Sequence, residues 1–148
     1  MNIRTFTLSI GVVFVVVGVL GFFPALMTPP APDAPVISTE YSLLFGMFPV
    51  NSLHNIVHLA IGAWGILVYK DLDASRLYAR SLAVLYSVLG VFGLIPALST
   101  LFGLVPLFGH DVWLHFLVAL AAAYFGFVSP VTVEMGHSGH ADRSGGIS

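Results

Sequence analysis

Long apolar stretches alternate with short polar connections along most of the chain. Four of these stretches cover residues 6–27, 52–69, 78–100 and 111–130. At a rise of 1.5 Å per residue, helices of about 18 to 23 residues cross a hydrocarbon core of roughly 30 Å. The pattern therefore predicts an all-α bundle of four transmembrane helices within a membrane domain that spans residues 1–133.

Composition supports a lipid bilayer as the main partner of the chain. Only 8% of the residues are charged, against about 25% in soluble domains. The absence of cysteine excludes disulfides and thiolate sites, and a net charge of −2 excludes a basic surface for nucleic acid. Residues 134–148, rich in Gly, Ser and His, are expected to be a disordered tail, in which His137 and His140 form only a weak metal-binding pattern.

Basic residues indicate the orientation of the predicted helices. The connections 28–51 and 101–110 contain neither Lys nor Arg. Basic residues lie instead in the termini and around the remaining connection: Arg4, Lys70, Arg76, Arg80 and Arg143. Under the positive-inside rule, a bacterial cytoplasmic membrane would hold both termini on its cytoplasmic side and the two connections without basic residues outside.

Two short motifs occur twice, in the same order. The pattern G-V-x-G-x-x-P-A-L is found in residues 17–26 and again, at an offset of 72, in residues 89–98. The pattern L-F-G-x-x-P is found in residues 44–49 and again, at an offset of 57, in residues 101–106. Residues 44–49 and 101–106 each precede an apolar stretch. The motifs therefore mark equivalent places in two copies of one unit.

Each copy contains one helical hairpin, in residues 6–69 and 78–130. Because a unit of two spans enters and leaves the membrane on the same side, both copies have the same orientation. The expected arrangement is two tandem hairpins related by a pseudo-two-fold axis along the membrane normal.

The repeat aligns two pairs of polar residues inside the second and fourth predicted helices. His54 and His58 correspond to Asp111 and His115. A spacing of four residues places both members of a pair on one helix face, and both pairs lie near the outer end. Imidazole and carboxylate suit Zn, Fe, Cu or Mn, so a divalent metal bound by these four side chains is the leading hypothesis.

Other interpretations of the same residues stay open. His58 and His115 could bind a haem iron axially, and Asn51 and Asn55 could orient ligands or cap a helix. The polar cluster could instead only fix helix packing in an accessory subunit without a cofactor, whose small-residue faces bind a second copy or a larger membrane complex. A third interpretation is a zinc-dependent intramembrane hydrolase, for which Glu40 is the candidate general base.

Residues 44–59, L-F-G-M-F-P-V-N-S-L-H-N-I-V-H-L, and residues 109–115, G-H-D-V-W-L-H, resemble a bacterial four-helix membrane family catalogued as a domain of unknown function. The resemblance implies a four-span fold and no established activity, so whether the protein is an enzyme stays open. A looser similarity links the layout to DoxX-type membrane proteins, some associated with quinone oxidation. The motif positions of the family would be Asn51, His54, His58, Asp111 and His115.

Overall fold

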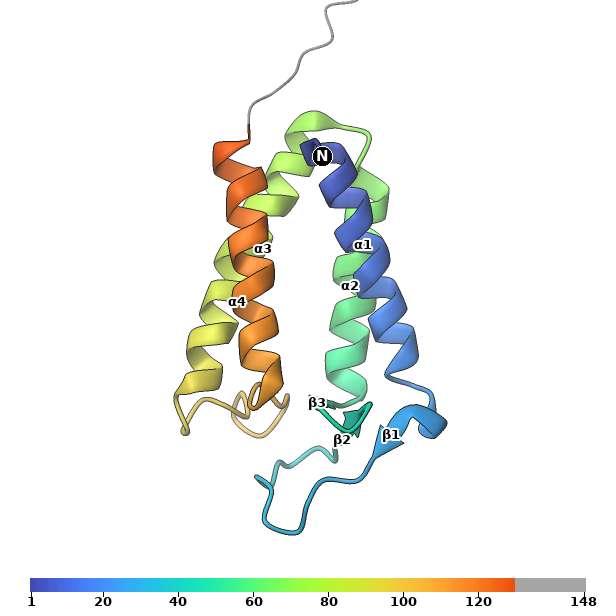
Figure 1. The fold of residues 1–148 in the computed structure, drawn as a ribbon, viewed down its shortest axis with the longest axis vertical. Helices are drawn as coiled ribbons and strands as arrows, with labels where there is room; N and C mark the ends of the chain where they lie inside the picture. The colour runs from blue at the N-terminus through green and yellow to red at the C-terminus, as the bar shows by residue number, and fades with distance from the viewer. Residues whose placement is uncertain (130–148) are drawn as a thin grey trace, which may run out of the picture.

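The computed structural model describes residues 1–129 and is dominated by helices. The predicted tail at 134–148, with His137 and His140, lies outside the described residues. The main helices are α1 (Ile3–Leu20), α2 (Ser52–Val68), α3 (Leu72–Leu94) and α4 (His110–Ala123), the last continued by a π-helical turn, η2 (Tyr124–Val128) (Figure 1).

The helices pack as two antiparallel hairpins. Helix α1 lies against α2, and α3 lies against α4 (Figure 1). The beginning of α1 and the end of η2 lie at the same end of the bundle, together with the connection from α2 to α3. The two longer connections, which contain no Lys or Arg, lie at the opposite end, and the name outer connections is kept for them from the predicted orientation.

Three helical segments of the described chain are long and apolar enough to cross a membrane. They are α1, α3 and the continuous stretch His110–Val128. Helix α2 is also apolar, and its 17 residues extend over roughly 26 Å. The protein is therefore a helical membrane protein.

Two prolines shorten the helices relative to the predicted spans. Helix α1 ends at Leu20 and α3 ends at Leu94, several residues before the predicted ends. Pro24 and Pro96 follow these ends. Proline lacks an amide hydrogen, and it also disfavours the helical conformation of the residue before it.

Helix α3 begins at Leu72, earlier than the predicted start at residue 78. The Asp71 carboxylate accepts a hydrogen bond from the Ala74 amide at 2.7 Å and so caps the helix. This cap allows a polar turn to join the apolar helix.

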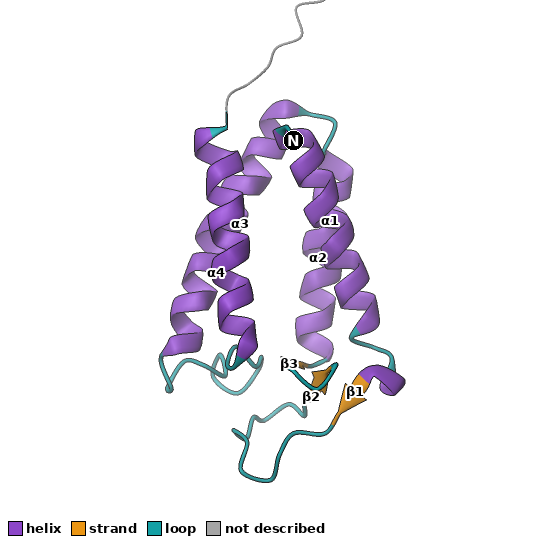
Figure 2. Ribbon diagram, viewed as in Figure 1, coloured by secondary structure: helices purple, strands orange, loops and turns teal. Residues whose placement is uncertain are grey.

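Strands occur in the first outer connection, where the all-α prediction has none. β1 (Met27–Thr28), β2 (Ser42–Leu44) and β3 (Phe48–Val50) form a small antiparallel sheet in that order (Figure 2). Phe45 and Gly46 take positive φ values of 53° and 72° and reverse the chain between β2 and β3. The apolar pattern of this segment therefore reflects a hairpin that covers one end of the bundle.

Glycines let the two helices of each hairpin approach closely. A Cβ added to Gly62 of α2 would lie 2.7 Å from the carbonyl oxygen of Gly11 in α1. In the other hairpin, a Cβ on Gly90 of α3 would lie 3.0 Å from the ring of Phe116 in α4. In both hairpins, backbone or ring atoms of the neighbouring helix therefore occupy the space that a side chain at the glycine position would need.

Asn51 fixes the outer end of α2 in two directions. Its Oδ1 accepts a hydrogen bond from the backbone amide of His54 at 2.9 Å and caps the helix. Its Nδ2 donates to Thr39 Oγ1 at 2.8 Å and to the Leu104 carbonyl at 2.7 Å. One side chain therefore joins the start of α2 to both outer connections.

We expect Asn51→Asp to destabilise the protein although a carboxylate keeps the helix cap. The substitution removes both amide donors and leaves the oxygens of Thr39 and Leu104 facing a carboxylate. The expected cost is about 1–3 kcal/mol in the free energy of unfolding. It would be measured in detergent by SDS-induced unfolding followed by circular dichroism.

The matched control is Asp71→Asn, which exchanges the same two groups at the exposed cap of α3. Because an amide oxygen can still accept the bond from Ala74, a change below about 0.5 kcal/mol is expected. Equal losses in the two variants would contradict the assigned role of the Asn51 amide.

Candidate metal centre

Helices α2 and α4 each carry two polar side chains one turn apart on their buried faces. His54 and His58 come from α2, and Asp111 and His115 come from α4. Their exposed fractions are 4%, 9%, 5% and 3% in that order. The four groups therefore lie in the protein interior, near the end that carries the sheet.

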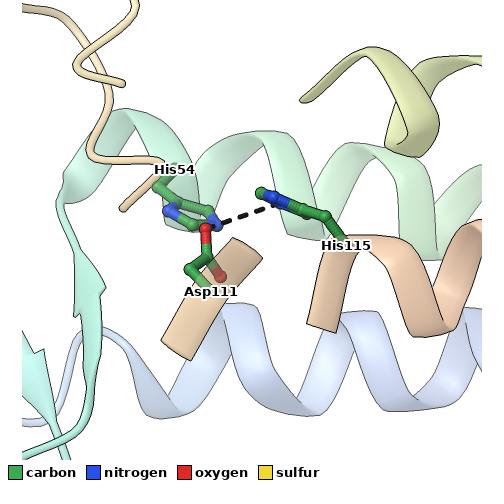
Figure 3. A group of neighbouring side chains, drawn as sticks. All are labelled: His54, Asp111 and His115. Carbon is green, nitrogen blue, oxygen red and sulfur yellow. Dashed lines mark ion pairs between the residues drawn. The ribbon is translucent and has the colours of Figure 1, made fainter. Parts of the chain in front are cut away.

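Three of the four side chains converge into one group across the two hairpins. His54, Asp111 and His115 each offer a ligand atom, and these atoms all lie within 4.8 Å of one another (Figure 3). Bonds of about 2.0–2.2 Å to a tetrahedral ion would hold ligand atoms roughly 3.5 Å apart. Modest side-chain rotation would close the three around an ion.

The cluster contains buried polar atoms that lack partners within residues 1–129. The Nδ1 atoms of His54, His58 and His115 make no hydrogen bond, and neither does Oδ2 of Asp111. The Asp111 Oδ2 lies 3.5 Å from Nε2 of His115, but this contact lacks hydrogen-bond geometry. Both an imidazole nitrogen and a carboxylate oxygen are therefore free to bind something else.

His58 lies beside this trio and not within it. The centres of the His54 and His58 rings are 4.5 Å apart. On its other side, the His58 imidazole stacks on Phe14 of α1, with 5.3 Å between centroids and an interplanar angle of 14°. The expected set of four ligands is thus divided into three convergent groups and one stacked neighbour.

A row of rings joins the two hairpins next to the site. Phe14 stacks on Tyr86 of α3 at 5.4 Å, and Tyr86 contacts His115 edge-on at 5.2 Å. With the Phe14–His58 stack, the row runs from α2 to α4. Sequence reasoning did not identify Phe14 and Tyr86, although their offset of 72 residues equals that of the glycine motifs.

The two asparagines have contacts of their own. Asn51 caps α2, and Asn55 Nδ2 donates a hydrogen bond to the Gly21 carbonyl at the end of α1, at 2.6 Å. Neither asparagine side chain hydrogen-bonds a His or Asp side chain of the cluster in the described chain. The observed contacts of the two asparagines position α2, and they do not orient the side chains of the cluster.

A largely apolar cavity of about 190 Å³ adjoins the cluster. It lies between α2, α3 and the second outer connection. Three histidines contribute to its wall, and most other lining residues are aliphatic, with one tyrosine: His54, His58, His115, Tyr86, Leu89 and Val105.

Glu40 belongs to a different pocket. This polar pocket of about 270 Å³ lies at the outer end of α1 and α2 and is also lined by Tyr41, Asn51 and Asn55. Burial raises the pKa of the Tyr41 hydroxyl. The carboxylate considered for a hydrolase is thus not one of the three convergent groups.

Comparisons with known proteins agree with the resemblance seen in the motifs. No curated protein and no solved structure matches the chain. The family described as "Domain of unknown function (DUF4383)" matches residues 4–128. Because this match covers most of the sequence and includes all residues of the cluster, the chain belongs to this family of unknown function.

Proposed function

We propose that the protein binds a divalent transition metal between its two hairpins, through His54, Asp111 and His115. One observation carries the proposal: ligand atoms from both hairpins lie within 4.8 Å of one another, inside a group of buried polar atoms that have no hydrogen-bond partner in residues 1–129. Within a membrane, such atoms cannot form hydrogen bonds to water instead.

The unpaired atoms favour a ligand site over a purely structural cluster. A buried donor or acceptor without a partner costs about 1–3 kcal/mol, so a cluster that only stabilises packing should pair its members. Here the Asp111 and His115 side chains are in contact without a hydrogen bond. Nδ1 of His54 makes no hydrogen bond to either of them. An ion would satisfy several of these atoms together.

The donor set suits several metals. Two imidazoles and one carboxylate are found around Zn²⁺ and Fe²⁺, and Mn²⁺ and Cu²⁺ also accept these donors. Three protein ligands leave a coordination position open, as in catalytic sites. Metal handling would follow with any of these ions, and redox chemistry with Fe or Cu.

Haem is less well supported as the cofactor. Phe14 stacks on His58 and Tyr86 contacts His115, so an aromatic ring already lies against each of the two proposed axial ligands. The adjoining cavity of about 190 Å³ is also below the 300–1,000 Å³ of typical sites for larger ligands.

The accessory and hydrolase hypotheses have weaker support than the metal hypothesis. Gly11, Gly62 and Gly90 pack inside the hairpins, so these small residues are not available to a second copy or another subunit. For a hydrolase, the candidate general base Glu40 lines the polar pocket beside Asn55 and not the apolar cavity at the histidines.

We further propose that all four helices span the membrane and that the two hairpins are copies related by a pseudo-two-fold axis. The two Phe-Gly turns support the relation between the hairpins, because Phe45-Gly46 and Phe102-Gly103 both have positive φ. Contacts between helices also recur at equivalent positions: Gly18 on Leu59 and Gly90 on Phe116, Gly21 on Asn55 and Gly93 on Val112, Phe14 on His58 and Tyr86 on His115.

The proposed location is a bacterial cytoplasmic membrane with both termini in the cytoplasm. Arg4, Lys70 and Arg76 belong to segments at one end of the bundle, and the two outer connections without basic residues lie at the other. The positive-inside rule then puts the metal site near the outer surface.

We expect purified, chelator-treated protein to bind about one Zn²⁺ or Co²⁺ per chain, with Co²⁺ showing the visible spectrum of a low-coordinate site. His54→Ala, Asp111→Ala and His115→Ala should each lower the affinity by about a hundredfold or more, because each removes a direct ligand. Isothermal titration calorimetry would measure this in a His137→Ala/His140→Ala background, which removes the histidines of the tail.

The matched control is His110→Ala, an exposed histidine next to Asp111 that should leave the affinity unchanged. His58→Ala should have a smaller effect than the three ligand variants. Absence of stoichiometric binding, or an equal loss on replacing His110, would refute the assigned site.

The topology has its own test, made simple by the absence of cysteine. Asp33→Cys lies in the first outer connection, and Asp73→Cys lies at the start of α3; both positions are exposed. We expect a membrane-impermeant maleimide to label Asp33→Cys in intact spheroplasts and Asp73→Cys only after permeabilisation. The opposite pattern, or labelling of both, would overturn the proposed orientation.

A further inference from the structure

The two Phe-Gly turns carry large apolar side chains on the surface of the protein, at the outer end of the bundle. Phe45 and Phe102 are 53% and 76% exposed. Two residues further along each turn, Met47 and Leu104 are 49% and 48% exposed. Exposed apolar side chains that recur at equivalent positions of both hairpins indicate a contact with something other than water.

Both turns hold a phenylalanine in an unusual backbone conformation. Phe45 has a φ of 53°, and in the second turn Leu101 and Phe102 have φ values of 44° and 59°. Residues other than glycine rarely adopt positive φ, because the side chain then crowds the backbone. A glycine or asparagine would form such a turn more easily and would also suit water. The exposed phenylalanine rings therefore have a role outside the fold of the turn itself.

The backbone of each turn is already hydrogen-bonded within its own connection. The amides of residues 45–47 donate bonds of 2.9–3.2 Å, and those of residues 103–105 donate bonds of 3.0–3.2 Å. The surrounding segments, residues 42–50 and 99–107, contain no charged residue. Such turns lose little when they leave water, so they are suited to the boundary between lipid headgroups and acyl chains.

The length of α2 brings the first turn to this boundary. The helix extends over roughly 26 Å, and the exposed, charged Lys70 and Asp71 follow its inner end. A hydrocarbon core of roughly 30 Å that begins beside these charges reaches roughly 4 Å past the first residue of α2, Ser52. It therefore reaches the sheet, whereas the connection from β1 to β2 extends further from the helices (Figure 1).

We propose that the two Phe-Gly turns lie at the boundary of the outer leaflet and insert four side chains among its acyl chains: Phe45, Met47, Phe102 and Leu104. The inference rests on the proposal that all four helices span the membrane. A bilayer surrounds the bundle and so meets the equivalent turns of both hairpins, whereas one partner protein would cover one side. Insertion would hold the outer end of each hairpin at a defined depth.

The test uses the full chain in phosphatidylcholine nanodiscs, with single cysteines that carry the fluorophore NBD. Nitroxide lipids, labelled either near the ester group or at the middle of the acyl chain, report depth, and iodide reports contact with water. Phe45→Cys and Phe102→Cys should lose most of their fluorescence to the shallow nitroxide and little to iodide. Strong quenching by iodide at either turn would overturn the proposal and indicate a surface free for a protein partner. Protection from every quencher would overturn it too, and would indicate a second copy.

The matched control is Val36→Cys, because this apolar residue belongs to the same connection as Phe45 and is 93% exposed. Its label should be quenched by iodide and not by the nitroxide lipids. Met47→Cys and Leu104→Cys repeat the test at residues without positive φ, so the result does not depend on the folding of the phenylalanine variants. Circular dichroism would confirm the helix content of each variant.

Ala60→Cys separates this inference from the proposal on which it rests. Ala60 is exposed at the middle of α2, so its label should be quenched most by the deep nitroxide. Deep quenching at Ala60 together with iodide quenching at the turns would overturn only the lipid contact of the turns. Quenching of Ala60 by iodide alone would show that α2 does not span the membrane, and both proposals would fail.

Discussion

Close approach of the two helices within each hairpin is the constraint that positions the polar residues. The backbone of α2 can lie against α1 only because Gly11 and Gly62 have no side chains at the point of contact. With that face of α2 fixed, the rotation of the helix is fixed as well. His54 and His58 then point into the space between the hairpins, and in the other pair the contact of Gly90 with Phe116 orients α4.

The space between the hairpins is where the stabilising and the functional demands on the chain conflict. Side chains such as Tyr78 and Leu82 are fully buried there, as expected of a packed core. The cluster at the outer end replaces such apolar contacts with imidazole and carboxylate groups whose polar atoms are incompletely paired. Because this arrangement costs stability, packing alone gives no reason for it, whereas the proposed bound ion would.

Much of this arrangement could be predicted from the sequence, and the exceptions have physical causes. The apolar stretches, their hairpin order and the burial of His54 and Asp111 follow from local pattern and helical spacing. Separation of His58 from the trio could not be foreseen, because it results from a stack on Phe14, a residue 44 positions away. The sheet of the first outer connection depends on the positive φ of Phe45, a conformation that phenylalanine rarely adopts and that residue type does not indicate.

The difference between the two hairpins at one position gives the proposed site its charge. If the hairpins are copies, His54 and Asp111 occupy equivalent places, and His58 and His115 form the other equivalent pair. Four histidines in that arrangement would leave a divalent ion with its full charge of two in a low-dielectric interior. One carboxylate reduces that charge, and burial makes the reduction matter more than it would in water. Under the proposed function, duplication would supply the geometry, whereas departure from symmetry at Asp111 would supply the electrostatics that a metal between the hairpins requires.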